Sequence, residues 1–340
     1  DIIINEDIIQ EIKDNYEKTK PDTLMVITEV EDPSAFGVVE LDGEKIVKII
    51  EKPKPGETDS KLINTGIYIF NKDIFDKIDK TEISPRGEYE ITDSLSMQIE
   101  DGKTIKGHFT TKKWMDIGKP WELIEINEEL LNDIKGEIRG TVEEGVTIHG
   151  EVFLDEGSLL RSGVYIKGPV YIGKNCDVGP NSYIRGNTYF GDNVHVGNAV
   201  EIKNSIIMEN TNVSHLSYVG DSILGSNCNI AAGTNIANLR FDNKNVKTTI
   251  KNKKIDSGRR KLGAIVGDSV KTGINSSLSP GVKIGVRSTI GSGVLLYDDL
   301  ESDMRVLVKQ EHIMQNKKIK EKKPKEEIKK EETTEENTTN

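Results

Sequence analysis

The stretch IKGPVYIGKNCDVGPNSYIRGNTYFGDNVHVGNAVEI, residues 166–202, places an apolar residue at every sixth position. The same phase begins further upstream and covers Val142, Ile148, Leu154, Leu160, Ile166, Ile172, Val178, Ile184, Phe190, Val196 and Ile202. Chance rarely keeps one phase over so many repeats, so the pattern indicates a regular structure. Glycine, which tolerates the turn that leaves each strand, follows the apolar residue at Gly173, Gly179, Gly191 and Gly197. This hexapeptide period predicts an all-β, left-handed parallel β-helix with its apolar residues pointing inward.

The period is interrupted once by a long polar segment. It slips twice by one residue, breaks over residues 237–263, and resumes from Val266 to Leu296. Long loops in repeat proteins often carry function, although a solvated loop is the simpler interpretation of a charged segment. The basic residues of this segment are Lys244, Lys247, Arg259, Arg260 and Lys261. We therefore predict a β-helix domain over residues 136–300 with an excursion at 237–263.

Residues 1–135 mix strand and helix patterns instead. Apolar residues recur at helical spacing within residues 6–20, and further segments indicate strands at 24–30, 46–50 and 62–70 and a short helix at 73–78. This alternation predicts an α/β, Rossmann-type domain. The opening Asp1-Ile-Ile-Ile-Asn is typical of the tail of a buried strand, so we expect an earlier part of this domain to be missing from the sequence.

Composition narrows the class of protein. The net charge of −11 argues against a nucleic-acid partner, which needs a basic surface. The two cysteines, Cys176 and Cys228, match neither a disulfide framework nor a zinc pair, and no apolar run is long enough to span a bilayer. We expect a cytoplasmic protein without a membrane segment. The charged tail, residues 301–340, is expected to be largely disordered because it contains few residues able to form a core.

The motif Ser-His-Leu-Ser-Tyr-Val-Gly-Asp at residues 214–221 follows the α/β segment within the repeat array. This combination resembles the bifunctional sugar-1-phosphate nucleotidylyltransferase and amino-sugar-1-phosphate N-acetyltransferase family, in particular its archaeal members. The resemblance covers about residues 1–300. It implies transfer of acetyl from acetyl-CoA to glucosamine 1-phosphate or galactosamine 1-phosphate, and a nucleotidylyltransferase activity that uses UTP or dTTP in the intact protein. It therefore implies a role in nucleotide-sugar biosynthesis.

The resemblance also implies roles for individual residues. The histidine of the motif, His215, matches the general base of acetyl transfer. Acceptor-binding positions of the family match Arg185, Lys203, Tyr218, Asn229, Asn238, Lys244 and Lys247. The residue types suit the chemistry, because only a deprotonated amine attacks a thioester and histidine titrates near neutral pH. A sugar phosphate needs cationic partners, and Arg185 and Lys203 stand one coil of eighteen residues apart, so we expect them to stack on one face.

Residues 1–135 contain further matches to the family, at the positions that serve nucleotidylyl transfer. Segments that contact the nucleotide sugar match Gly37, Glu51, Lys52 and Asn64, and the family's magnesium-binding carboxylates match Asp1 and Asp116. The family's glycine-rich G-x-G-T-R loop does not occur in these residues. We therefore expect the chain as given not to activate a sugar phosphate.

Other interpretations of the same layout stay open. Nucleotidyl transfer to glucose 1-phosphate is the main alternative activity, and a non-catalytic scaffold of the same two-domain layout is a second. The set His215, Tyr218, Asn229 and Lys244 argues against the scaffold. Acyltransferases of this architecture use a cleft between neighbouring helices, so we expect a homotrimer in which the excursion reaches a neighbour.

Overall fold

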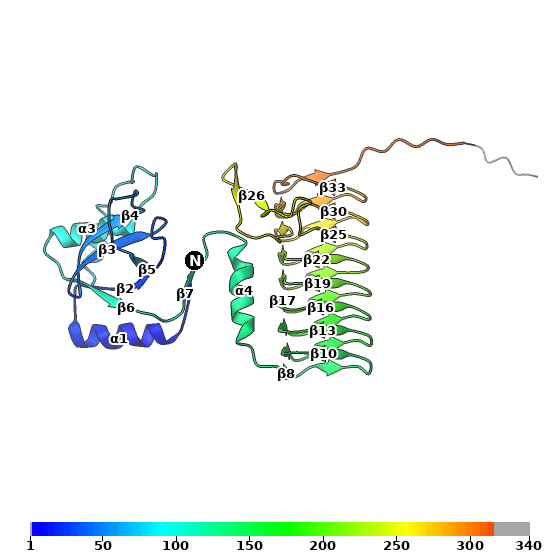
Figure 1. Cartoon of the computed structure of the whole chain (residues 1–340), viewed down its shortest axis with the longest axis horizontal. Helices are drawn as coiled ribbons and strands as arrows, with labels where there is room; N and C mark the ends of the chain where they lie inside the picture. The colour runs from blue at the N-terminus through cyan, green and yellow to red at the C-terminus, as the bar shows by residue number, and fades with distance from the viewer. Residues whose placement is uncertain (1, 316–340) are drawn as a thin grey trace, which may run out of the picture.

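The computed structural model describes residues 2–315, and Figure 1 shows a front region, a connecting helix and a tall stack of parallel strands. The front region is built around five strands closed into a barrel in the order β2-β5-β3-β4-β6. Its strands and helices are β1 (Ile2–Ile4), α1 (Asp7–Thr19), β2 (Thr23–Glu29), β3 (Gly37–Asp42), β4 (Lys45–Glu51), β5 (Leu62–Phe70), α2 (Ile74–Ile78), α3 (Ile91–Glu100), β6 (Ile105–Phe109) and β7 (Trp114–Asp116).

The predicted elements of this region are all present. Strands β2 and β6 run parallel, whereas β3, β4 and β5 pair antiparallel, so the sheet is mixed. The expectation of a buried first strand is wrong: Ile2 is exposed and Ile3 and Ile4 are half-buried. Strand β1 has only β7 beside it, and a two-stranded ribbon covers little surface.

The second region is a three-sided parallel β-helix, as the hexapeptide period predicts. Its first face contains β8 (Glu137–Ile138), β11 (Val152–Leu154), β14 (Val170–Ile172), β17 (Thr188–Phe190), β20 (Ile206–Ile207), β23 (Ile223–Leu224), β28 (Ile265–Val266) and β31 (Lys283–Ile284). The second face contains β9 (Thr141–Val142), β12 (Leu159–Leu160), β15 (Asp177–Val178), β18 (His195–Val196), β21 (Asn212–Val213), β24 (Asn229–Ile230), β29 (Lys271–Thr272), β32 (Thr289–Ile290) and β34 (Arg305–Val306). The third face contains β10 (Thr147–His149), β13 (Tyr165–Lys167), β16 (Tyr183–Arg185), β19 (Glu201–Lys203), β22 (Tyr218–Gly220), β25 (Asn235–Ile236), β30 (Ser277–Leu278) and β33 (Leu295–Leu296).

The apolar ladder forms the core of this stack. From Leu154 to Ile202 every sixth residue is completely buried. Val142, with 39% exposure, and Ile148, which is half-buried, are the exceptions, because β9 and β10 are the last strands of their sheets and no coil covers their outer side. The other end also differs from prediction: β34 pairs with β32, so the last coil extends beyond residue 300 to Val306. The expectation of disorder for residues 316–340 falls outside the described part of the chain.

Helix α4 (Glu122–Asn132) stands between the two regions and lies against the first face (Figure 1). The excursion folds into a hairpin, β26 (Lys247–Ile250) and β27 (Lys253–Asp256), and packs on this helix. Val246 and Leu262 of the excursion are buried in one cluster with Trp121 and Ile124. The body of the excursion is therefore a packed part of its own chain and more than a solvated loop.

The beginning of the excursion is different, because Phe241 in its first turn is fully exposed. No helix in residues 2–315 is long and apolar enough to cross a membrane.

We predict that Phe190→Ala destabilises the β-helix by about 3–5 kcal/mol, because it removes a completely buried ring from the ladder and leaves a cavity. Phe190→Leu keeps most of the volume and is expected to cost about 1 kcal/mol. The measurement is the urea midpoint of the β-helix transition, followed by circular dichroism. Equal midpoints for the two variants would contradict this packing.

Candidate functional site

The third face of the β-helix aligns the cations that the sequence singles out. Arg185 lies directly opposite Lys203 in the parallel register of β16 and β19, and Lys167 lies opposite Arg185 on the other side. The expectation that Arg185 and Lys203 stack one coil apart is therefore confirmed. Three cations thus follow one edge of the third face on successive coils.

Two of these cations have acidic partners. An Nη1 of Arg185 donates to Oε1 of Glu201 at 3.0 Å, and this hydrogen bond raises the arginine pKa. Nζ of Lys203 lies 3.0 and 2.9 Å from the two carboxylate oxygens of Asp221. Among the described residues, Lys167 has no ion-pair partner. Opposite charges on neighbouring coils offset the repulsion between the stacked cations.

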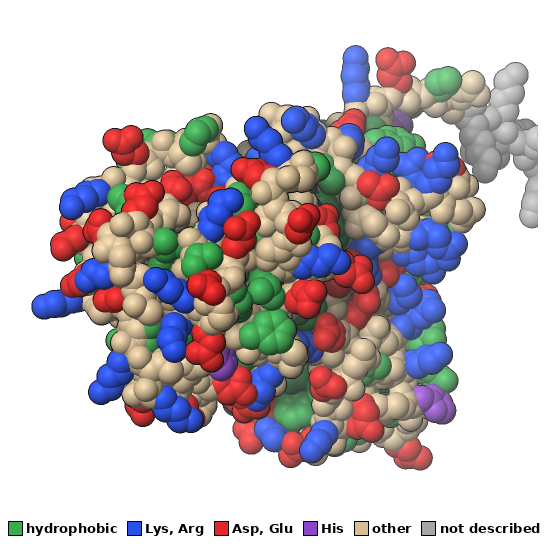
Figure 2. All heavy atoms as spheres, turned by 60° about the vertical axis from the view of Figure 1, so that its left-hand side comes forward, with side chains coloured by type: hydrophobic (Ala, Val, Ile, Leu, Met, Phe, Trp, Pro, Cys, Tyr) green, Lys and Arg blue, Asp and Glu red, His purple; other side chains and the backbone are tan. Residues whose placement is uncertain are grey.

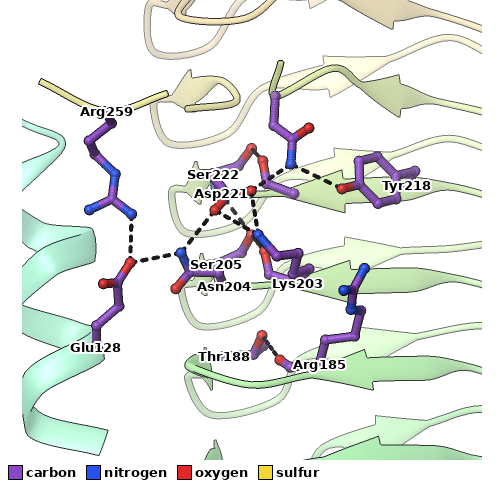
Figure 3. Close-up of polar contacts among 12 residues, drawn as sticks. Glu128, Arg185, Thr188, Lys203, Asn204, Ser205, Tyr218, Asp221, Ser222 and Arg259 are labelled. Atoms are coloured by element: carbon purple, nitrogen blue, oxygen red, sulfur yellow. Dashed lines mark hydrogen bonds and ion pairs between the residues drawn. The ribbon is translucent and has the colours of Figure 1, made fainter. Parts of the chain in front are cut away.

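Tyr218 lies on the same face, one coil above Glu201. Nδ2 of Asn238 donates to the Tyr218 hydroxyl oxygen at 3.0 Å and to Asp221 at 2.5 Å (Figure 3). Burial raises the pKa of Tyr218, so its hydroxyl keeps its proton at neutral pH. Gly220 is required here, because a Cβ at that position would overlap the Tyr218 hydroxyl and the Asn238 amide. This explains the glycine of the Ser214–Asp221 motif.

A pocket of about 340 Å³ adjoins the cations where the third face turns into the first. Its walls are Lys167, Arg185, Lys203, Asn187 and Asn204 with the intervening glycines, and Glu128 of α4 closes it. Oδ1 of Asn204 is buried there without a hydrogen-bond partner among the described residues. The pocket therefore offers cationic side chains to a small polar ligand.

His215 lies at the other edge of the third face, in the turn between β21 and β22. Its carbonyl accepts hydrogen bonds from Gly233 N–H at 3.0 Å and from the Ser217 hydroxyl at 2.8 Å, which fix the backbone of the turn. The imidazole is exposed and forms no hydrogen bond within residues 2–315. Strand β22 lies between His215 and Asp221, and its three extended residues span a width of roughly 10 Å. That width suits a phosphorylated monosaccharide.

The remaining residues of the predicted acceptor site are not gathered here. Asn229 is exposed on the second face, and Lys244 and Lys247 are exposed in the excursion. Within the described residues no hydrogen bond or ion pair connects these three side chains to Arg185, Lys203 or His215.

Sequence reasoning assigned no role to Asp221, Asn204 or Lys167. The coil period contained a signal for all three: Lys167 precedes Arg185 by eighteen residues, Asp221 follows Lys203 by eighteen, and Asn204 follows Asn187 by about one coil. The same coil period places Lys167 one coil before Arg185 and places Asp221 about one coil after Asn204.

In the front region three predicted nucleotide-sugar residues meet. A Cβ on Gly37 would lie 2.8 Å from Oε2 of Glu51 and 3.7 Å from Cβ of Asn64, so glycine leaves room between them. Glu51 accepts a hydrogen bond from Arg86 at 3.2 Å. Asn64 donates to the hydroxyl of Tyr68, whose pKa burial raises to about 12. Lys52 is exposed and has a left-handed φ of 47°.

Asp116 lies at the end of β7 and lines a second pocket of about 350 Å³ with Phe36 and Trp114. It is exposed, and its carboxylate forms no hydrogen bond or ion pair within the described chain. Asp1 lies outside the described residues, but its neighbour Ile2 pairs with Asp116. Residues 2–315 contain no cluster of three metal-binding side chains. A free carboxylate fits one ligand of a magnesium site, and no complete site is described.

The surface in Figure 2 is evenly mixed in charge over the front region, with a basic cluster toward the β-helix. Local cations, and not the overall charge, must therefore attract an anionic ligand to the third face.

Comparisons with known proteins agree with this organisation. Residues 1–133 match the family described as nucleotidyl transferase, and residues 166–274 match the GMPPB C-terminal domain. The bifunctional protein GlmU of Methanocaldococcus jannaschii is 47% identical over 93% of this chain and 77% of its own length. The bifunctional protein GlmU of Methanococcus maripaludis strain C7 is 50% identical over 93% of this chain and 75% of its own length.

A third relative, from Sulfurisphaera tokodaii, is described as a bifunctional sugar-1-phosphate nucleotidylyltransferase/acetyltransferase. It is 45% identical over 83% of this chain and 70% of its own length. With this identity over both regions, the chain belongs to the archaeal family of bifunctional sugar-1-phosphate nucleotidylyltransferase/acetyltransferases, the GlmU-like proteins.

Proposed function

We propose that the chain transfers acetyl from acetyl-CoA to the amine of glucosamine 1-phosphate or galactosamine 1-phosphate on the third face of the β-helix. One observation carries this proposal: stacked Arg185 and Lys203 lie at one edge of the face and His215 at the other. A hexosamine 1-phosphate has an anion at one end and an amine near the other. The family to which the chain belongs includes an acetyltransferase by name.

In the proposed reaction His215 accepts a proton from the acceptor amine. The amine nitrogen attacks the thioester carbonyl, so a C–N bond forms and the C–S bond breaks. Coenzyme A leaves as the thiolate and takes up a proton. The exposed imidazole is accessible to a substrate from solvent, as this role requires.

Arg185 and Lys203 then bind the phosphate, and Tyr218 donates its hydroxyl proton to it. We assign Asn238 to the placement of Tyr218, with which it forms a hydrogen bond. Asn229, Lys244 and Lys247 stay proposed substrate contacts on the basis of the family resemblance. Their exposure leaves them available to acetyl-CoA or to a neighbouring subunit.

The front region is proposed to serve nucleotidylyl transfer in the intact protein, with Gly37, Glu51, Lys52 and Asn64 at the sugar. Asp116, together with Asp1, would hold Mg²⁺, which supplies positive charge to the phosphates when bound. The free carboxylate of Asp116 supports this assignment. Both activities use metabolites of the cytoplasm, where we place the enzyme.

We also propose a homotrimer. Two features of a single chain support a neighbour at this site: the His215 imidazole has no orienting partner among the described residues, and Phe241 in the first turn of the excursion is fully exposed. A catalytic base normally has a group that holds its ring.

Removing the phosphate contacts tests the acceptor. Arg185→Ala or Lys203→Ala is expected to raise KM for glucosamine 1-phosphate about ten-fold or more, because each loses a charge-assisted hydrogen bond. Activity on free glucosamine is expected to change little. Coenzyme A release reports both rates, and an equal loss on the two acceptors would assign these residues to the fold or the donor.

Removing the base tests the chemistry. His215→Ala is expected to lower kcat by roughly 10² to 10⁴, the usual contribution of a general base. The circular dichroism spectrum should be unchanged, since the stability of a repeat stack is distributed along it. Wild-type turnover between pH 6 and pH 8 would mean that His215 is not the base.

Light scattering tests the oligomer, with three chains per particle as the expected result. Phe241→Asp is expected to lower both the trimer fraction and acetyl transfer, because it places a charge at the proposed contact. Phe75→Asp is the matched control, since Phe75 is also exposed but lies on α2 in the front region. A fully active monomer would disprove the trimer.

A further inference from the structure

Asp221 is the most highly connected buried acid of the third face. The residue is 2% exposed, and four hydrogen bonds reach its two carboxylate oxygens. Two come from Nζ of Lys203, at 3.0 and 2.9 Å. Nδ2 of Asn204 donates at 2.9 Å and Nδ2 of Asn238 at 2.5 Å (Figure 3). All four contacts need an acceptor, which an ionised carboxylate supplies on both oxygens.

This requirement fixes the direction of the next hydrogen bond. Because the Asp221 carboxylate only accepts, Asn238 must turn its NH₂ group toward it. The same NH₂ group donates to the Tyr218 oxygen at 3.0 Å. The Tyr218 hydroxyl is therefore an acceptor toward Asn238 and keeps its own proton for another partner. Within residues 2–315 no acceptor takes that proton.

The Asp221 carboxylate is also connected, through Asn204, to residues of α4 and of the excursion. Nδ2 of Asn204 also donates to Glu128 of α4 at 2.8 Å, and Arg259 of the excursion donates to Glu128 at 2.5 Å. Figure 3 shows this chain of contacts running from α4 to the third face. Asp221 thus has partners on the β-helix and, through Asn204, on the connecting helix.

We propose that Asp221 is a positioning residue for the acceptor phosphate. It holds the ammonium group of Lys203 at the edge of the third face and, through Asn238, sets the Tyr218 hydroxyl as a hydrogen-bond donor toward the phosphate. This proposal rests on the proposed acetyl transfer to a hexosamine 1-phosphate. The raised pKa of Tyr218, caused first by burial and then by the nearby Asp221 charge, supports a hydroxyl that stays protonated.

Asp221→Asn tests the polarity of this network. Asparagine has nearly the same side-chain shape as aspartate, but an NH₂ group replaces one carboxylate oxygen. That NH₂ group then faces two of the four donors and cannot accept their hydrogen bonds. Pairing is restored when the Asn238 amide turns over, and its oxygen then accepts the Tyr218 proton. The variant should therefore lose both the counter-ion of Lys203 and the donor toward phosphate.

We expect Asp221→Asn to weaken binding of glucosamine 1-phosphate about ten-fold, measured as Kd by calorimetry and as KM. With free glucosamine the KM should change by less than about two-fold. Tyr218→Phe should show a defect of the same kind. The double variant should be no worse than Asp221→Asn, because Asp221→Asn already removes the hydrogen bond from Tyr218 to the phosphate. Asp177→Asn is the matched control, since it breaks a two-contact ion pair with Arg161 on the second face. It should leave both acceptors unaffected.

The opposite results are equally clear. Equal losses on both acceptors, or additive effects of Asp221→Asn and Tyr218→Phe, would make Asp221 a structural residue and overturn the proposal. If Asp221→Asn does not fold, Asn238→Ala removes the relay but leaves the ion pair, and an unchanged Kd for glucosamine 1-phosphate would overturn it. If the wild-type protein releases no coenzyme A, the proposed function fails, while the Kd series still decides the role of Asp221.

Discussion

The in-register stacking of parallel coils is the constraint on which the rest of this structure depends. Each inward apolar residue lies on the equivalent residue one coil later, as Leu154 does on Ile172, so each outward residue also has neighbours directly above and below at about 4.8 Å. A cation on this surface therefore lies beside the side chain at the same register position of the neighbouring coil. Arg185 and Lys203 are adjacent for that reason, and Glu201 and Asp221 are there to offset their repulsion.

The same constraint explains what sequence could predict. The hexapeptide period predicted the ladder, the three faces and the pairing of Arg185 with Lys203, because all of them follow from register alone. It failed at Val142 and at residues 301–306, where the stack ends and no further repeat signals burial or pairing. The resemblance of the motifs to the family indicated the candidate site residues, but it did not predict which of them contact one another. The role of Asp221 depends on hydrogen-bond direction, which no spacing encodes.

The excursion itself was predicted, but its packing on α4 was not, for a different reason. Their packing joins Trp121 and Ile124 to Val246 and Leu262, more than a hundred residues later. Each segment alone has too few apolar residues to indicate its partner, and the basic Arg259 suggested a solvated surface. Instead its side chain is largely covered and forms ion pairs with Glu125 and Glu128.

These two segments change the electrostatics of the site. In a protein with a net charge of −11, local cations must attract an anion, and each additional acidic partner of those cations weakens the attraction. Glu128 borders the pocket next to Lys203 and would compete for its ammonium group, but Arg259 and Asn204 already bind that carboxylate. Lys203 is left to Asp221, whose two oxygens hold it at the edge of the third face. The packing of the excursion on α4 therefore keeps Glu128 of the connecting helix from pairing with the cations of the third face, where we propose that the sugar phosphate binds.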